Sequence, residues 1–173
     1  MNLREQISSA MRGTVVVMGM GNPCRGDDEA GSLVARKIAD ARDVHAIDAQ
    51  DVPENYLCQV ADRRPDTIVL IDSVDLKATP GSVALLEKDQ LASYWPSTHR
   101  VPTYLLMNYL ERESHARVFL LAIQPSQTDF SHPLSAAVSS SIEAIASILN
   151  EIVAIRQGPA QARVLSQSRE APT

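Results

Sequence analysis

The chain has 173 residues, a length that fits one α/β domain and leaves little room for a second independent core. Apolar residues make up 45% of it and charged residues 21%, which is the mixture of a folded globular protein and excludes the disordered and fibrous classes. The formal net charge is −5 and there is no run of Lys or Arg. We therefore expect neither a nucleic-acid partner nor binding to an anionic membrane.

Apolar runs such as Thr14–Met20 and Val118–Ile123 are too short to cross a bilayer core of roughly 30 Å, so no transmembrane helix is expected. Residues 1–12 lack the continuous apolar segment of a secretory signal, which predicts a cytoplasmic protein. The two cysteines, Cys24 and Cys58, are too few for a disulfide framework and lack the spacing of a redox or zinc motif. Both thiols are expected to be reduced.

The N-terminal part of the chain alternates predicted strands and helices. Runs of β-branched and apolar residues predict strands buried on both faces, and apolar positions that share one stripe predict helices. In chain order the pattern predicts a strand over 14–18, a helix capped by Asp27 or Asp28 and reaching about 42, a strand over 44–47, a helix from 53 to about 62, and a strand over 67–71.

The C-terminal part continues the same alternation. It predicts a short strand over 82–87, an exposed loop over 88–101, a helix from 102 to about 113, a strand over 117–123 and a final helix marked by Leu134, Val138, Ile142, Ile145 and Leu149. The short strand follows the previous one too closely for a helical crossover, so it is expected to pair antiparallel. From residue 158 onward the chain has little to bury, which predicts one domain over 1–157 and a disordered tail over 158–173.

The alternation predicts an α/β fold: a three-layer α/β/α sandwich whose central sheet is mostly parallel and contains one antiparallel strand. Ligands of such folds bind outside the carboxyl ends of the strands. Three strands are predicted to deliver an acid to that edge, because Asp28 follows the first strand after a loop, Asp48 ends the second and Asp72 ends the third.

The glycine-rich loop after the first strand invites comparison with nucleotide-binding motifs, and both comparisons fail. A Rossmann fingerprint needs a glycine where this chain has Cys24, and the Gly-Lys-Ser/Thr ending of a P-loop is missing. The acids Asp27, Asp28 and Glu29 would also repel a pyrophosphate at the start of the next helix. Dinucleotide binding is therefore disfavoured.

The acids of the loop have different interpretations. Asp27 and Glu29 are explained by the helix dipole, which a carboxylate in the first turn complements by about 0.3–1 kcal/mol. Asp28 is predicted to lie beside Asp72, and two anions at one sheet edge repel unless a cation or a shared proton separates them. That pair favours a metal site, although Asp72 taken alone could serve as a helix-cap or loop acceptor.

His99 lies in a predicted loop just before a helix. If that loop folds over the strand edge, its imidazole and the two carboxylates form a three-ligand site suited to nickel or zinc. The other histidines, His45, His115 and His132, lack acidic company in the predicted structure and are interpreted as structural or solvated. Cys24 lies near Asp28, but no histidine is placed to activate it as a nucleophile.

These residues together resemble the [NiFe]-hydrogenase maturation endopeptidases, particularly the branch that serves hydrogenase 3 of formate hydrogenlyase. The resemblance covers nearly the whole domain and depends on a set of short motifs. They are Gly19-Met20-Gly21-Asn22-Pro23, Gly26-Asp27-Asp28-Glu29-Ala30-Gly31, Ile47-Asp48 with Pro53-Glu54-Asn55, Ile71-Asp72 with Pro80-Gly81, Thr98-His99 with Pro102, and Ile123-Gln124-Pro125. Close relatives often have Gly where this chain has Glu29, and no family pattern extends beyond about residue 155.

The resemblance implies an endopeptidase that removes the C-terminal extension of a nickel-loaded hydrogenase large-subunit precursor, cutting after a basic residue. It implies that Asp28, Asp72 and His99 contact the nickel, which the precursor carries, and that no metal is permanently bound. Asp28 and Asp72 are then the catalytic carboxylates of an aspartyl-type protease, and we expect a monomer whose partner is the precursor.

Two mechanisms are compatible with these residues. Nickel can polarise the scissile carbonyl as a Lewis acid, or it can only position the peptide while a carboxylate activates water as a general base. The alternative function is a non-catalytic nickel- or nucleotide-binding accessory protein. The acidic loop argues against nucleotide, and the lack of His-rich or Cys-rich tracts argues against nickel storage.

Overall fold

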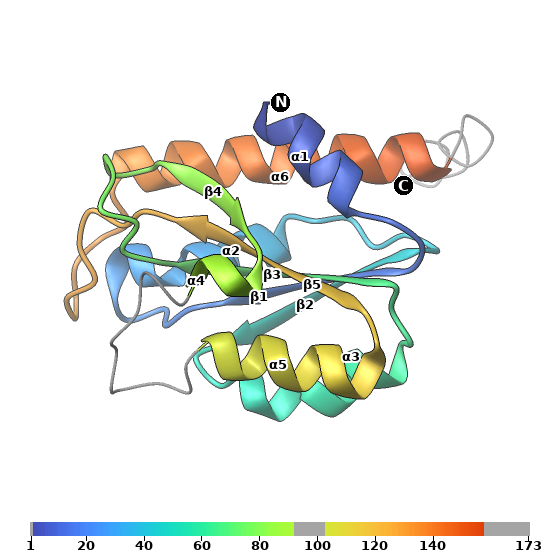
Figure 1. The fold of residues 1–173 in the computed structure, drawn as a ribbon. Helices are drawn as coiled ribbons and strands as arrows, with labels where there is room; N and C mark the ends of the chain where they lie inside the picture. The colour runs from blue at the N-terminus through green and yellow to red at the C-terminus, as the bar shows by residue number, and fades with distance from the viewer. Residues whose placement is uncertain (1, 92–102, 158–173) are drawn as a thin grey trace, which may run out of the picture.

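A five-stranded sheet forms the centre of the computed structural model, which describes residues 2–91 and 103–157 (Figure 1). Its strands are β1 (Val15–Met20), β2 (Val44–Gln50), β3 (Thr67–Ser73), β4 (Val83–Leu86) and β5 (Arg117–Ile123). They lie in the order β2-β1-β3-β5-β4, with β1, β2, β3 and β5 parallel and β4 antiparallel to β5. The predicted mostly parallel sheet with one antiparallel strand is confirmed.

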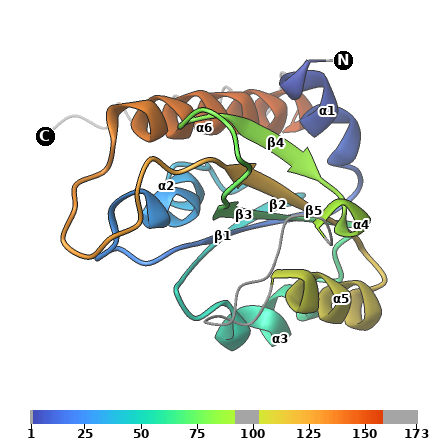
Figure 2. The same cartoon turned by 60° about the vertical axis from the view of Figure 1, so that its left-hand side comes forward.

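Helices cover both faces of this sheet (Figures 1 and 2). On one face lie α1 (Leu3–Ala10), α2 (Ala30–Arg36) and α6 (Ala136–Gln157), whose apolar side chains share a buried cluster with alternate residues of β1, β3 and β5. On the other face lie α3 (Leu57–Asp62) and α5 (Thr103–Ser114), which bury the remaining alternate residues in a second cluster. All six residues of β1 are buried because helices cover both of its sides.

The short elements complete the connections. The 3-10 helices η1 (Gly26–Glu29) and η2 (Pro53–Tyr56) precede α2 and α3, and α4 (Lys88–Leu91) follows β4. The structure therefore corrects the expectation of a loop over 88–101, since its first four residues are helical; residues 92–102 lie outside the described residues, as does the tail 158–173. The predicted strand over 117–123 has the observed bounds of β5.

Two elements differ from the expectation for local reasons. The sequence analysis assigned no helix to residues 1–12, yet α1 forms there, because Asn2 and Glu5 make a reciprocal capping box at its start and Ile7 and Ala10 are buried. The helix expected from Asp27 or Asp28 to about residue 42 is divided. It begins as η1, continues as α2 from Ala30 without a side-chain cap and ends at Arg36.

Helix α6 is the one helix among the described residues that is long and apolar enough to cross a membrane by length and composition, with 22 residues and a mean hydropathy of 1.5. The expectation that every apolar stretch is too short overlooked it. Its inward residues, including Val138, Ile142 and Leu149, pack in the cluster between α6 and the sheet. A core helix of this kind has the same length and composition as a membrane span, so the test does not distinguish them.

Candidate active site

Two buried carboxylates meet at the carboxyl ends of β1 and β3. Asp28 comes from η1 and Asp72 from β3, and each residue is only 7% exposed. Ser73 connects them: its amide donates to Asp72 Oδ1 at 2.8 Å and its hydroxyl donates to Asp28 Oδ1 at 3.1 Å. The backbone amide of Asn22 donates to the other oxygen, Asp28 Oδ2, at 3.2 Å. The structure thus brings together the two acids that the sequence placed at this edge.

Glycines make this meeting possible. The first turn of α2 packs so tightly on the sheet that a Cβ on Gly31 would lie 2.0 Å from the carbonyl oxygen of Ile71 and 2.5 Å from that of Met20. A Cβ on Gly19 would in turn lie 2.0 Å from the carbonyl oxygen of Gly31. Real Cβ atoms do not approach this closely, so any larger residue forces the backbones apart. The contact fixes Asp28, three residues before Gly31, beside Asp72, the residue after Ile71.

Asp27 faces away from this pair and binds the loop between β5 and α6. The residue is fully buried. Its Oδ2 accepts hydrogen bonds from the amide of Ser126 at 2.7 Å and the hydroxyl of Ser135 at 2.9 Å, and its Oδ1 accepts one from the amide of Ser135 at 2.7 Å. The expectation that Asp27 serves the helix dipole is therefore wrong: it joins η1 to the loop, and no side chain caps α2.

Asp48 is engaged elsewhere. It lies within β2, which extends to Gln50, and its carboxylate accepts hydrogen bonds from the Ser32 hydroxyl and from Arg36 Nε, the latter at 2.6 Å. Burial raises the pKa of the Asp48 carboxyl, but the hydrogen bonds from Ser32 and Arg36 outweigh it and hold the pKa below its ordinary value. Glu29 pairs with the same guanidinium at 3.0 Å. Asp48 and Glu29 are thus held together by a cation at the side of the Asp28–Asp72 pair.

Gln124 supports the loop that follows Asp72. Its side chain is buried, and Gln124 Oε1 accepts hydrogen bonds from the amides of Leu76 at 2.7 Å and Ala78 at 3.2 Å. Sequence reasoning singled out Gln124 only as part of a family motif, and it missed Ser73. The signal for Ser73 was present, since a hydroxyl that directly follows the strand-end acid is placed to reach a neighbouring carboxylate.

A third metal ligand is not found in the part of the chain that the structure describes, where no three His, Cys, Asp or Glu residues form a group that could hold an ion. His99, the expected third ligand, lies outside the described residues. His45 Nδ1 instead lies 3.3 Å from Arg63 Nη1. Cys24 and Cys58 are exposed free thiols, as expected.

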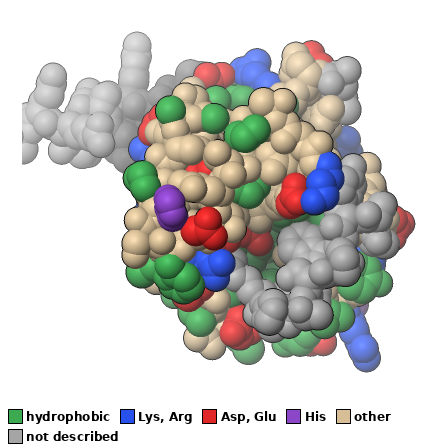
Figure 3. Space-filling view, turned by 90° about the vertical axis from the view of Figure 1, so that its left-hand side faces the viewer, with side chains coloured by type: hydrophobic (Ala, Val, Ile, Leu, Met, Phe, Trp, Pro, Cys, Tyr) green, Lys and Arg blue, Asp and Glu red, His purple; other side chains and the backbone are tan. Residues whose placement is uncertain are grey.

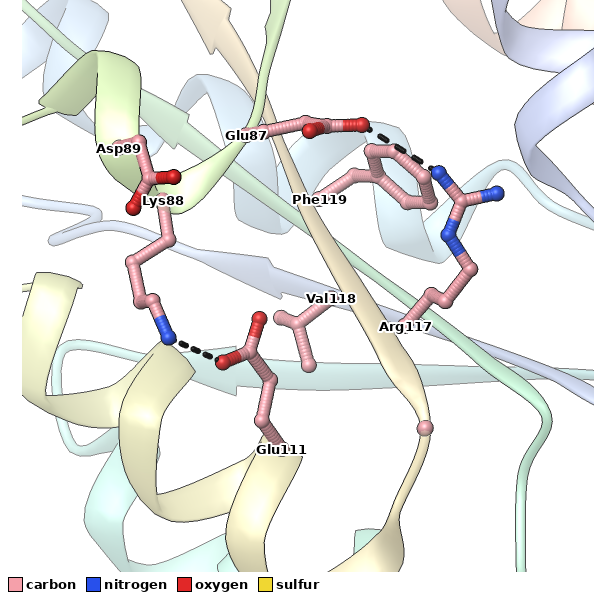
Figure 4. A pocket seen from close by; sticks show the side chains of 8 residues that line it. Glu87, Lys88, Asp89, Glu111, Arg117, Val118 and Phe119 are labelled. Carbon is pink, nitrogen blue, oxygen red and sulfur yellow. Dashed lines mark hydrogen bonds and ion pairs between the residues drawn. The ribbon is translucent and has the colours of Figure 1, made fainter.

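Figure 3 looks onto the end of the molecule where the parallel strands finish, and acidic side chains gather there beside hydrophobic ones. A separate hollow of about 330 Å³ lies at the opposite edge, where β5 begins (Figure 4). Its charges pair with one another: Lys88 Nζ lies 2.5 Å from Glu111 and Arg117 lies 3.3 Å from Glu87. It lacks the pair of neighbouring buried carboxylates, so we place the candidate active site at the Asp28–Asp72 edge.

Comparison with known proteins agrees with this placement. The family model of the hydrogenase maturation proteases matches residues 30–152, a span that includes Asp72 and begins two residues after Asp28. The chain is 30% identical over 135 residues to the hydrogenase 3 maturation protease of Escherichia coli, covering 76% of this chain and 86% of that one. It is 29% identical over 149 residues to a putative hydrogenase maturation protease of Methanocaldococcus jannaschii, covering 80% and 88%.

Solved structures give the same result for the fold. The crystal structure of a [NiFe] hydrogenase maturation protease, HycI, from Thermococcus kodakarensis superposes with a TM-score of 0.79 at 25% identity, covering 86% of this chain and 98% of that one. An α/β fold with buried carboxylates at the carboxyl edge of its sheet is the class that the structure defines. The chain belongs to the hydrogenase maturation protease family, and it is accordingly a peptidase.

Proposed function

We propose that this peptidase removes the C-terminal extension of a [NiFe]-hydrogenase large-subunit precursor that already carries its nickel, and that it cuts after a basic residue. The observation that carries the proposal is the Asp28–Asp72 pair, joined through Ser73 and only 7% exposed at each residue. Two anions held this close favour a cation between them, because a positive charge relieves their repulsion. In this proposal the cation is the nickel of the substrate.

The chemistry follows from oxygen and imidazole ligands. Carboxylates with one histidine suit a borderline divalent ion and leave positions open for ligands from the substrate. Asp28, Asp72 and His99 are proposed to hold the nickel, which places the scissile peptide bond beside the same carboxylates. A carboxylate at that position can accept a proton from the attacking water as a general base. No metal of the protease's own is needed in this scheme.

The close fit around the pair supports a precise substrate geometry. The glycine contacts of α2 fix Asp28, and Gln124 holds the loop that follows Asp72. Catalytic groups on a rigid frame lose little free energy to reorganisation when the substrate binds. We place the protease in the cytoplasm as a monomer, because the chain's composition and sequence gave no sign of export or of a self-associating surface.

Purified precursor loaded with nickel is expected to be shortened by the wild-type protein, with mass spectrometry of the released peptide showing cleavage after a basic residue. Cys24→Ser is expected to cut at a rate within about twofold of wild type, because the Cys24 thiol is exposed and no proposed step uses it. An inactive Cys24→Ser variant that remains folded would indicate a thiol protease. An uncut precursor would favour the non-catalytic accessory protein.

A further inference from the structure

The loop between β5 and α6 carries an aromatic side chain that is exposed yet fixed. Phe130 is 64% exposed, and its ring lies over the guanidinium of Arg25 with 4.8 Å between the guanidinium carbon and the ring centroid. Arg25 Nε donates to the carbonyl oxygen of Thr128 at 2.9 Å. The cation therefore stacks on the ring and also holds the backbone just before it. We call the Phe130 ring and the Arg25 side chain the Phe130 platform.

The backbone beneath the platform is held at further points. The amide of Ser131, next to Phe130, donates to the carbonyl oxygen of Cys24 at 2.9 Å. The buried carboxylate of Asp27 binds the amides of Ser126 and Ser135 on either side of Phe130. Gly26, at a φ of +55°, packs against the same loop, where a Cβ would lie 3.1 Å from the carbonyl oxygen of His132. The loop is thus built to present its exposed ring in one position.

The platform is directly connected to the active site. The amide of Asp28 donates to the carbonyl oxygen of Arg25 at 3.1 Å, so the residue that stacks on Phe130 and the residue that faces Asp72 belong to the same turn. A polypeptide that reaches the carboxylate pair passes close to the ring. Fixed aromatic side chains are the residues that most often dominate the free energy of an interface, because they bury a large apolar area and lose little conformational entropy.

A single exposed apolar side chain needs no explanation by itself. Ile155 is such a residue: it is 69% exposed near the end of α6 and has no place near the carboxylate pair. Phe130 differs because a stacked cation and four backbone hydrogen bonds fix its surroundings beside the site. The contrast gives a matched control residue within the same chain.

We infer that the Phe130 platform is a docking surface for the precursor polypeptide, on which an apolar side chain of the substrate packs while the cleaved bond lies at Asp28 and Asp72. The inference rests on the proposed function, since it takes the precursor as the substrate. It adds a substrate-binding residue that the carboxylate pair alone does not provide.

The test measures both binding and cleavage of nickel-loaded precursor by wild type, Phe130→Ala, Phe130→Leu and Ile155→Ala. Phe130→Ala is expected to weaken binding and raise KM about tenfold, a typical loss for an interface aromatic, while kcat stays within about twofold. Phe130→Leu should recover most of the affinity because it restores apolar area. Ile155→Ala should match wild type in both measurements, and all variants should keep the wild-type melting temperature because both side chains are exposed.

The outcomes separate the two claims. Equal affinity and equal KM for wild type and Phe130→Ala would overturn the docking surface while the peptidase assignment stands. If wild type binds the precursor without cutting it, and Phe130→Ala binds more weakly, the proposed function fails and the docking surface stands. Precursor that binds to no variant, wild type included, would overturn both.

Discussion

Asp72→Asn is expected to lower kcat/KM for nickel-loaded precursor by about 100-fold or more while the protein stays folded. Asn keeps the size of the side chain and one acceptor oxygen, so the hydrogen bond from the Ser73 amide can persist. It loses the negative charge that a divalent cation favours, and electrostatic stabilisation by a metal site is worth several kcal/mol of the activation barrier. Cleavage rates at several precursor concentrations measure the loss.

Asp75→Asn is the matched control for this variant. Asp75 lies three residues further along, is exposed, and pairs with Lys77 instead of facing Asp28. Its replacement should change kcat/KM by less than about twofold, because exposed ion pairs contribute little free energy. Equal losses in the two variants would mean that general charge, and not the Asp28–Asp72 pair, governs cleavage.

Gly31→Ala is expected to lower activity far more than its loss of stability explains. The added Cβ would meet the carbonyl oxygens of Ile71 and Met20 at 2.0 and 2.5 Å, so α2 must move away from the sheet. Overpacking of this kind costs about 1–3 kcal/mol of unfolding free energy. The same movement takes Asp28 away from Asp72, and a misplacement of about 1 Å can cost on the order of 100-fold in rate.

Ala154→Gly separates the two effects of Gly31→Ala. Ala154 lies on the exposed side of α6, and glycine in a helix interior costs about 1 kcal/mol relative to alanine. Urea unfolding and precursor cleavage are measured on both variants. Ala154→Gly should lose stability and keep its activity. If Gly31→Ala is as active as Ala154→Gly at similar stability, the tight contact of α2 does not position the site.

The sheet was predictable from the sequence because its strands have strong local signals. Continuous apolar runs mark β3 and β5, and the Pro80-Gly81 turn precedes the antiparallel β4. The start of the chain was missed for a different reason. Helix α1 is short and its hydrophobic residues are few, so its capping box at Asn2 was its strongest signal and was not weighed.

The acidic pair was also predictable, since topology alone brings the ends of parallel strands to one edge. The partners of the other acids were not. Asp48 ends near the same edge, but its pairing with Arg36 depends on where α2 stops and how it lies over β2. Asp27 and Asp28 are neighbours in sequence and face opposite directions because η1 is a 3-10 helix, a detail that helical periodicity did not reveal.

The most direct test of the account compares nickel-loaded with nickel-free precursor, each incubated with the wild-type protease and followed by the gel shift of the large subunit. The account predicts that only the nickel-loaded form is shortened, because the nickel of the substrate is what Asp28, Asp72 and His99 are proposed to recognise. Adding nickel to the nickel-free form under loading conditions should restore cleavage. Equal cleavage of both forms would contradict the account, since the carboxylate pair would then act without the metal.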